Sequence, residues 1–291
     1  MSATAVSRPA RSAAAPGRDH AWALLLAPAV GFLGVFFLVP LVEMATRSVT
    51  EPSAHNYTEF FEASAYVRVL TTSFRTAALV TVCCLALAYP YAYAMRRTGR
   101  LGFVVLSAAL LLPFWSSLLV RSFAWITLLQ DTGVINDALT SSGITSEPLA
   151  LIRNELGVVV GMTHILLPYM VLPLYAAMSR IDLGLVDAAK SLGAPPRVAF
   201  WRVFFPLTTP GLVAGSLLVF VLALGFYITP ALLGGPQETM VGQLIADQVT
   251  EQVRFGFASA IGIVLLVVTF AVLGVGVAIL QRAGVFKAVL S

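Results

Sequence analysis

Long uncharged stretches alternate with shorter charged ones along the whole chain. Six windows of 20 residues or more are strongly apolar and contain no Asp, Glu, Lys or Arg: 21–42, 76–95, 101–120, 157–178, 211–233 and 259–280. A helix needs roughly 20 apolar residues to cross the hydrocarbon core of a bilayer. Strands of membrane barrels are about ten residues long and alternate in polarity. The pattern therefore predicts an all-α polytopic membrane protein with six transmembrane helices.

The composition excludes several other classes. Only 11% of the 291 residues are charged and 58% are hydrophobic, whereas a soluble domain carries about a quarter charged residues. Intrinsic disorder is excluded for the same reason. The cysteines, Cys83 and Cys84, are adjacent, which excludes a disulfide-stapled secreted domain. A net charge of +4 without a basic stripe gives no reason to expect a nucleic-acid partner. A lipid bilayer is the environment that this composition fits.

The charges between the windows sort by side. If both termini are cytoplasmic, the cytoplasmic segments hold 12 of the 18 Lys and Arg residues and only three acids, and the opposite side holds six Arg and eleven acids. Cytoplasmic segments of membrane proteins are enriched in Lys and Arg. We therefore expect both termini on the cytoplasmic side.

The sequence divides into a tail, a membrane domain and a short end. Residues 1–20 are rich in Ala, Ser, Pro and Arg and predict a disordered cytoplasmic tail. Residues 21–282 form the transmembrane domain, and 283–291 a cytoplasmic C-terminus. A cleaved signal peptide is the alternative for the start, because three arginines precede an apolar stretch. The stretch is long, however, and the residues that end it (40–43, PLVE) offer no small-residue cleavage site.

One predicted cytoplasmic segment, 179–210, is much longer than the turn at 96–100. Long segments in compact proteins are usually functional. Its first part predicts a short helix, because Asp182 can cap its start and Asp187 lies three residues before Lys190 on one face. Ala188 and Ala189 keep part of that helix surface small.

The second part of this segment predicts a sharp turn and a second short helix. Gly193 follows the last turn of the first helix, where a positive φ favours glycine. Pro195 and Pro196 then fit the first turn of the next helix. An apolar stripe on that helix is expected to run back toward the membrane; its members are Phe200, Trp201, Phe204 and Phe205.

These residues resemble a known motif. Asp187-Ala188-Ala189, followed after three residues by Gly193-Ala194 and later by Phe204-Phe205-Pro206, is similar to the EAA loop in the membrane subunits of binding-protein-dependent ABC importers. The usual leading Glu is Asp here. Two further stretches, 112–125 (LPFWSSLLVRSFAW) and 230–236 (PALLGGP), resemble the spermidine/putrescine permease subfamily, most closely its B-type subunit.

The resemblance implies a type I ABC importer permease fold in the bacterial cytoplasmic (inner) membrane. It also implies that the 179–210 segment docks on a cytoplasmic ATPase dimer, which carries the ATP and Mg, and that a second homologous permease and an extracytoplasmic substrate-binding protein complete the system. No catalytic residue, metal site or cofactor is expected in this chain. The residues expected to couple to the ATPase are Asp187, Ala188, Ala189, Gly193, Ala194 and Pro206. An amphipathic interfacial helix without a partner is the alternative, but it needs no such turn.

Other energy sources are less compatible with the sequence. The chain has no Gly-x-x-x-x-Gly-Lys-Ser/Thr run, so it carries no P-loop of its own. A proton-coupled secondary transporter usually has buried acids, and no acid falls in any window. His164 could relay protons, although a hydrogen bond to a neighbouring helix is the favoured interpretation. Gly211 and Gly215 predict close helix packing. A membrane scaffold without transport is a third class.

The substrate implied by the resemblance is a polyamine, with other small solutes as the alternative. A polyamine cation would favour carboxylates or aromatic faces along its path. Tyr89, Trp115 and Thr229 are therefore candidate residues of the translocation path. Aromatic belts at the two membrane interfaces account for the tyrosine and the tryptophan as well, and are the favoured interpretation.

Overall fold

A computed structural model describes residues 18–282, so most of the predicted tail and the whole of 283–291 lie outside the described residues. The chain divides into two compact units, 1–46 and 47–291. Within the described part, the first unit consists of helix α1 (Arg18–Thr50) up to residue 46. Because α1 begins at Arg18, it includes the last three residues assigned to the tail.

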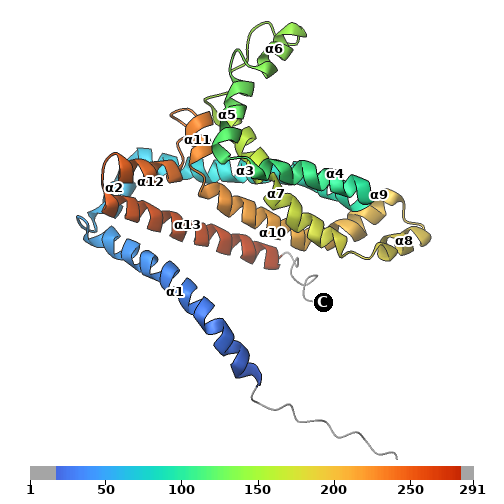
Figure 1. Ribbon diagram of the computed structural model, residues 1–291, viewed down its shortest axis with the longest axis horizontal. Helices are drawn as coiled ribbons and strands as arrows, with labels where there is room; N and C mark the ends of the chain where they lie inside the picture. Colours follow the sequence, from blue (N-terminus) through green and yellow to red (C-terminus); the bar gives the residue numbers. More distant parts are fainter. Residues whose placement is uncertain (1–17, 283–291) are drawn as a thin grey trace, which may run out of the picture. The chain divides into compact units, whose positions relative to one another are not determined.

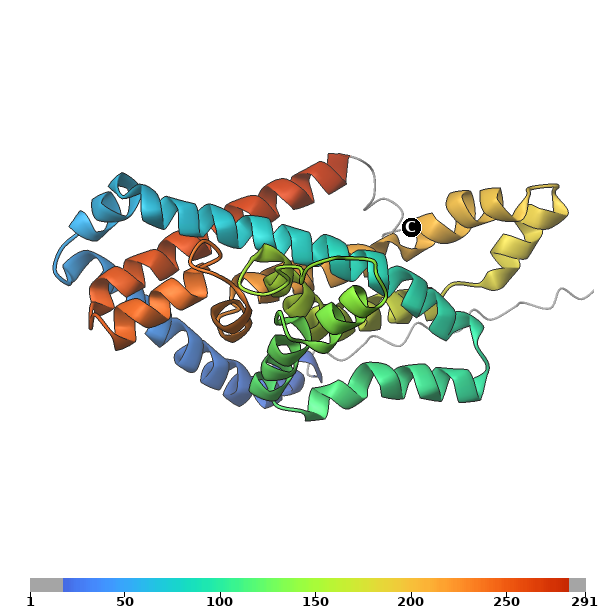
Figure 2. The same ribbon diagram turned by 90° about the horizontal axis from the view of Figure 1, so that it is seen from above.

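The second unit is built of helices that run along and across one another (Figures 1 and 2). In chain order they are α2 (His55–Glu62), α3 (Ser64–Arg97), α4 (Arg100–Leu111), the 3-10 turn η1 (Leu112–Trp115), α5 (Leu118–Leu129), α6 (Val134–Ser141), α7 (Glu155–Ser179), α8 (Leu183–Ser191), α9 (Pro196–Ala199), the π-helical turn η2 (Phe200–Phe204), α10 (Phe205–Leu224), α11 (Ile228–Leu233), α12 (Val241–Thr250) and α13 (Phe255–Arg282).

Six helical segments in the described range are long and apolar enough to cross a membrane, and the shorter apolar segment Arg100–Trp115 adds to them. The all-helical class and the number of spans are as predicted. Four predicted windows lie within α1, α3, α7 and α13, which extend beyond them at one or both ends. The third and fifth windows differ more.

The third predicted span, 101–120, is not one helix. It is broken at Ser116 and Ser117, whose backbones are extended (ψ 146° and 145°). Pro113 lies in the first half of the 3-10 turn η1, and the Ser116 hydroxyl donates to its carbonyl at 2.7 Å, which closes the turn. Beyond the break, α5 and α6 project away from the helices that surround α3 (Figure 1). The window's uncharged composition could not reveal a change of direction.

The fifth predicted span, 211–233, is displaced. Its first part lies in a helical segment that runs from Pro196 to Leu224, and the chain then breaks at Gly225–Tyr227 before the short α11. Tyr227 has φ −126°, outside helical geometry. The uncharged window is thus an apolar stretch, as predicted, but the helix neither begins nor ends where the window does.

The core of the second unit is formed by α3, α7 and α10, which carry most of its buried side chains. α10 runs antiparallel to α7 and lies against it at two glycines. A Cβ atom on Gly211 would lie 2.5 Å from the Cβ of Ala177, and one on Gly215 would lie 2.9 Å from the Sδ of Met170. The close packing predicted for these glycines is confirmed. Cys84 is buried between α3 and α7 and donates to the carbonyl of Thr163 at 3.6 Å, as expected of a packing residue.

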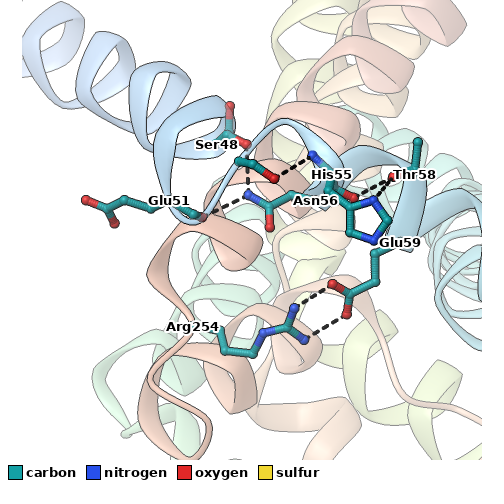
Figure 3. Close-up of polar contacts among 8 residues, drawn as sticks. Ser48, Glu51, His55, Asn56, Thr58, Glu59 and Arg254 are labelled. Carbon is teal, nitrogen blue, oxygen red and sulfur yellow. Dashed lines mark hydrogen bonds and ion pairs between the residues drawn. The ribbon is translucent and has the colours of Figure 1, made fainter.

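A second apolar cluster joins α2 and the start of α3 to α12 and α13. At its edge the Arg254 guanidinium donates two hydrogen bonds to the Glu59 carboxylate, at 2.8 and 2.6 Å (Figure 3). Beside this pair, the Asn56 amide donates to the carbonyls of Ser48 and Glu51, both at 2.9 Å. These contacts fix the turn that precedes α2.

The Glu59–Arg254 pair predicts an acid-sensitive contribution to stability. The hydrogen bonds from Arg254 lower the pKa of Glu59. The contribution is therefore complete above the pKa of the unfolded chain, near 4.3, and is lost as the pH falls through the lower folded-state pKa. We expect Glu59→Gln to lower the free energy of unfolding by about 1 kcal/mol at neutral pH and by less at pH 3.

Thermal unfolding of the purified protein between pH 3 and pH 8 tests this expectation. Glu62→Gln, at an exposed position on the same helix, is the matched control. A difference between Glu59→Gln and the unaltered protein that stays constant over the whole pH range would contradict the assignment.

Candidate functional site

The segment after α7 forms a short helix whose N-terminus is capped by a side chain. Asp182 is the N-cap of α8, and its Oδ1 accepts a hydrogen bond from the backbone N–H of Gly184 at 2.8 Å. One helical turn further on, Lys190 Nζ lies 2.9 Å from Asp187 Oδ1. Both contacts are those predicted from the sequence. They fix where α8 begins and keep its only acid on the exposed side.

The two faces of α8 differ. Leu183 and Val186 are half-buried and pack against the core cluster. Leu185, Asp187 and Ala188 are exposed on the other side. A helix with one face held by the bundle and the other offered to the surroundings can serve as a docking element.

A sharp turn, residues 192–195, follows α8 and is called the elbow here. Gly193 has φ +89°, a conformation that side chains with a Cβ rarely adopt. Its N–H donates to the carbonyl of Lys190 at 2.9 Å, and the N–H of Ala194 donates to the carbonyl of Ala189 at 3.1 Å. These bonds satisfy carbonyls at the end of α8 in the manner of a glycine C-cap. Leu192 at the tip is 90% exposed.

After the elbow the chain does not form a second short helix, which corrects the sequence prediction. Pro195 is the N-cap and Pro196 the first residue of α9, as expected, but α9, η2 and α10 continue as one helical segment to Leu224. The wide turn η2 precedes Pro206, which lacks the N–H that an α-helix would offer to the carbonyl of Arg202. Pro206 is exposed at the start of α10 and lies outside the elbow.

An aromatic cluster connects the helix after the elbow to α3. Tyr93 meets Phe200 and Phe204 edge to face, with ring centroids 5.6 and 5.4 Å apart. Tyr89 packs on Phe200 and Phe205 at 6.3 and 5.6 Å. Edge-to-face contacts of this kind stabilise beyond the area they bury. The stripe predicted from the sequence is therefore packed on α3, with one exception.

That exception is Trp201, which is 61% exposed and whose ring lies against those of Phe200 and Phe205, two members of its own stripe. Tyr93 is packed in this cluster as well, and its spacing of four residues from Tyr89 places both rings on one face of α3.

The three candidate path residues do not lie together. Tyr89 belongs to the aromatic cluster, and its hydroxyl is 3.4 Å from that of Thr208. Trp115 is 83% exposed in η1. Thr229 is fully buried in α11, with its hydroxyl 3.3 Å from that of Ser122. The described residues bring no shared site around them, so their role in a translocation path stays a prediction.

His164 is engaged in a contact between helices. The indole N–H of Trp125 on α5 donates to its Nδ1 at 3.2 Å, and the two rings meet edge to face. The favoured interpretation of this histidine, a hydrogen bond to a neighbouring helix, is confirmed. The contact also helps hold α5 against α7.

The two stretches that carry the subfamily resemblance meet in space. Ser122 in the first stretch faces Thr229, just before the second. The second stretch is also fixed to the start of α7, because the N–H of Arg153 donates to the carbonyl of Leu233 at 2.8 Å. Gly235 donates to Glu238 Oε2 at 2.9 Å, which closes the turn after α11. The sequence contained both stretches but gave no sign of their contact.

Comparison with known proteins places these features in context. The family model described as binding-protein-dependent transport system inner membrane component matches residues 19–284. The spermidine/putrescine transport system permease protein PotB of Haemophilus influenzae is 34% identical over 243 residues, 79% of this chain and 85% of the relative. PotB of Escherichia coli is 32% identical over 249 residues, 82% of this chain and 90% of the relative.

Another relative is named for a different solute. The molybdenum transport system permease protein ModB of Mycobacterium bovis is 31% identical over 253 residues, 83% of this chain and 89% of the relative. The fold is that of a solved structure, a bacterial alginate ABC transporter in complex with an alginate pentasaccharide-bound periplasmic protein. It has a TM-score of 0.72 at 17% identity, and the match covers 91% of this chain and 96% of that chain.

Proposed function

The chain belongs to the family of binding-protein-dependent transport system inner membrane components, as a multi-pass permease subunit of an ABC transporter, and from this premise we propose that it imports a polyamine by ATP-driven alternating access. ATP and Mg would be bound by a separate ATPase dimer. A second permease would complete the pathway, and an extracytoplasmic protein would deliver the solute. Both termini, α8 and the elbow would face the cytoplasm.

The observation that carries the proposal is the geometry of α8 and the elbow. The docking face of α8 would present Asp187 and Ala188, where a small side chain allows a partner to approach closely, and the half-buried Ala189 would lie at its edge. Gly193 and Ala194 would fix the angle of approach through the bonds that end α8. Pro206 would act from a distance, by setting the wide turn that starts α10.

The aromatic cluster offers a route by which movement at the elbow would reach the membrane helices. α9 follows the elbow directly, and η2 is packed on Tyr89 and Tyr93 of α3. A push on α8 would thus be transmitted both along α10 and across to α3. Closely packed side chains transmit displacement because protein interiors have low compressibility.

The polyamine assignment is supported by the relatives named for spermidine and putrescine and by the two stretches at 112–125 and 230–236. ModB, named for molybdenum transport, has comparable identity. Overall identity therefore does not separate a polyamine from the solute of ModB.

Uptake experiments separate the proposal from its competitors. In vesicles containing the chain with its partner subunits, we expect uptake of labelled spermidine to require internal ATP and to stop with orthovanadate but to continue with a protonophore. The reverse pattern would indicate a proton-coupled transporter. No uptake together with no copurifying ATPase would indicate a scaffold. ATP-dependent uptake of molybdate in place of spermidine would keep the permease role and replace the solute.

A further inference from the structure

A small pocket lies between α8, the end of α3 and the start of the α9–η2–α10 segment. Its volume is about 100 Å³. Three cations line it, namely Arg96, Arg97 and Lys190, together with apolar and aromatic side chains that include Tyr93 and Phe200. None of its described lining residues is acidic. The pocket lies on the bundle side of α8, so it is separate from the face that would meet an ATPase.

Contacts within the protein hold the three cations in place and leave the charge of the two arginines available. Arg96 Nε donates to the carbonyl of Met178, at the end of α7, at 3.2 Å. The Arg97 guanidinium lies 5.5 Å from the centroid of the Tyr93 ring. Lys190 is paired with Asp187, which neutralises one of the three charges. The pocket therefore keeps a net positive charge and two guanidinium groups.

The chemistry of the lining selects its occupant. Guanidinium groups bind phosphate oxygens through paired, charge-assisted hydrogen bonds. Basic pockets between membrane helices on the cytoplasmic side suit anionic lipid headgroups. A water molecule occupies about 30 Å³ in the liquid, so a pocket of about 100 Å³ has room for a phosphate group but not for a long solute.

We propose that this pocket is a phosphate-binding site that ties α8 to α3, with an anionic phospholipid headgroup or a free phosphate as the source of the group. The placement of the pocket at the cytoplasmic surface rests on the proposed function. Binding itself does not, because it needs neither the ATPase nor the solute. An occupant would bridge the arginines of α3 and the lysine of α8, and would thereby restrain α8.

Binding to the full-length chain in lipid nanodiscs tests the site. Native mass spectrometry would count the phosphatidylglycerol molecules retained after release from nanodiscs of mixed phosphatidylglycerol and phosphatidylcholine. Each cation near a membrane surface contributes about five-fold to the binding of an anionic lipid. We therefore expect the double variant Arg97→Gln/Lys190→Gln to bind the lipid with roughly 25- to 30-fold lower affinity. We also expect bound lipid to slow the hydrogen exchange of α8 in the unaltered protein but not in the double variant.

Two variants serve as controls. Arg100→Gln removes a cation at the same end of the bundle that does not line the pocket, and is expected to retain the lipid. Arg97→Lys/Lys190→Arg keeps both charges and is expected to restore binding, which separates loss of charge from misfolding. If the pair of substitutions to Gln prevents folding, Arg97→Gln alone is expected to give about a five-fold loss.

A second arm distinguishes the sources of the phosphate group. In nanodiscs of phosphatidylcholine alone, pyrophosphate is added and its binding measured by calorimetry. If pyrophosphate binds with the same dependence on Arg97 and Lys190 and no phosphatidylglycerol is retained, the site exists and its phosphate comes from a soluble source. Retained phosphatidylglycerol with that dependence supports the lipid source. The proposal would be overturned if Arg100→Gln and the double variant lost the same amount of lipid and pyrophosphate binding, or if neither variant lost any.

Discussion

Replacement of Gly193 by Val is expected to reduce ATP-dependent uptake roughly five- to thirty-fold while the protein still inserts in the membrane. The φ of +89° at this residue costs an L side chain about 1–2 kcal/mol, and a β-branched one is poorly suited to it. No described atom lies within 4 Å of the position of a Cβ. The effect would therefore come from the backbone and not from a clash.

The strain would be relieved by rotation of the elbow, which would turn α8 away from its docking angle. Uptake at equal membrane abundance is the measurement. Gly99→Val is the matched control, because Gly99 lies in the turn between α3 and α4 with φ −70° and is equally free of close neighbours. Gly193→Asn is expected to keep more activity than Gly193→Val, since asparagine tolerates positive φ. Full uptake by Gly193→Val would remove the elbow from the mechanism.

Replacement of Gly211 by Leu is expected to prevent accumulation of the folded protein. Even the Cβ of an alanine would lie 2.5 Å from the Cβ of Ala177 and 2.7 Å from the carbonyl oxygen of Pro173. The second atom belongs to the backbone of α7, so the helices would have to separate. Overpacking of a core costs about 1–3 kcal/mol, which we expect for Gly211→Ala, and the larger leucine would cost more.

The membrane level of the protein and its unfolding midpoint in detergent check this prediction. Gly274→Leu on α13 is the control, because no described atom lies within 4 Å of its Cβ position. Normal levels of Gly211→Leu would mean that α7 and α10 do not pack as closely as the structure has them.

The sequence predicted the elements whose causes are local. The cap at Asp182, the pair of Asp187 and Lys190, and the positive φ at Gly193 each depend on residues a few positions apart. These features follow from helix geometry alone, and all three are present. The helical class followed equally directly from windows that are free of charge.

The sequence could not predict features that depend on direction or on distant partners. The absence of charged residues does not indicate where a helix ends or changes direction, so the sequence did not predict the helix breaks at Ser116 and at Gly225. The sequence predicted a separate second short helix after Pro196, whereas the helical segment continues past Pro206 through a wide turn to Leu224. The contact of Ser122 with Thr229 joins positions 107 apart, and no pattern along the chain records it.

The central claim is that the exposed face of α8 docks on a separate ATPase. A photo-reactive amino acid in place of Ala188, in cells that also produce the partner ATPase, tests it directly. The account predicts a cross-link to the ATPase from this position and none from Val253, which is exposed in the turn between α12 and α13. Absence of a cross-link from Ala188, or an equal cross-link from Val253, would contradict it.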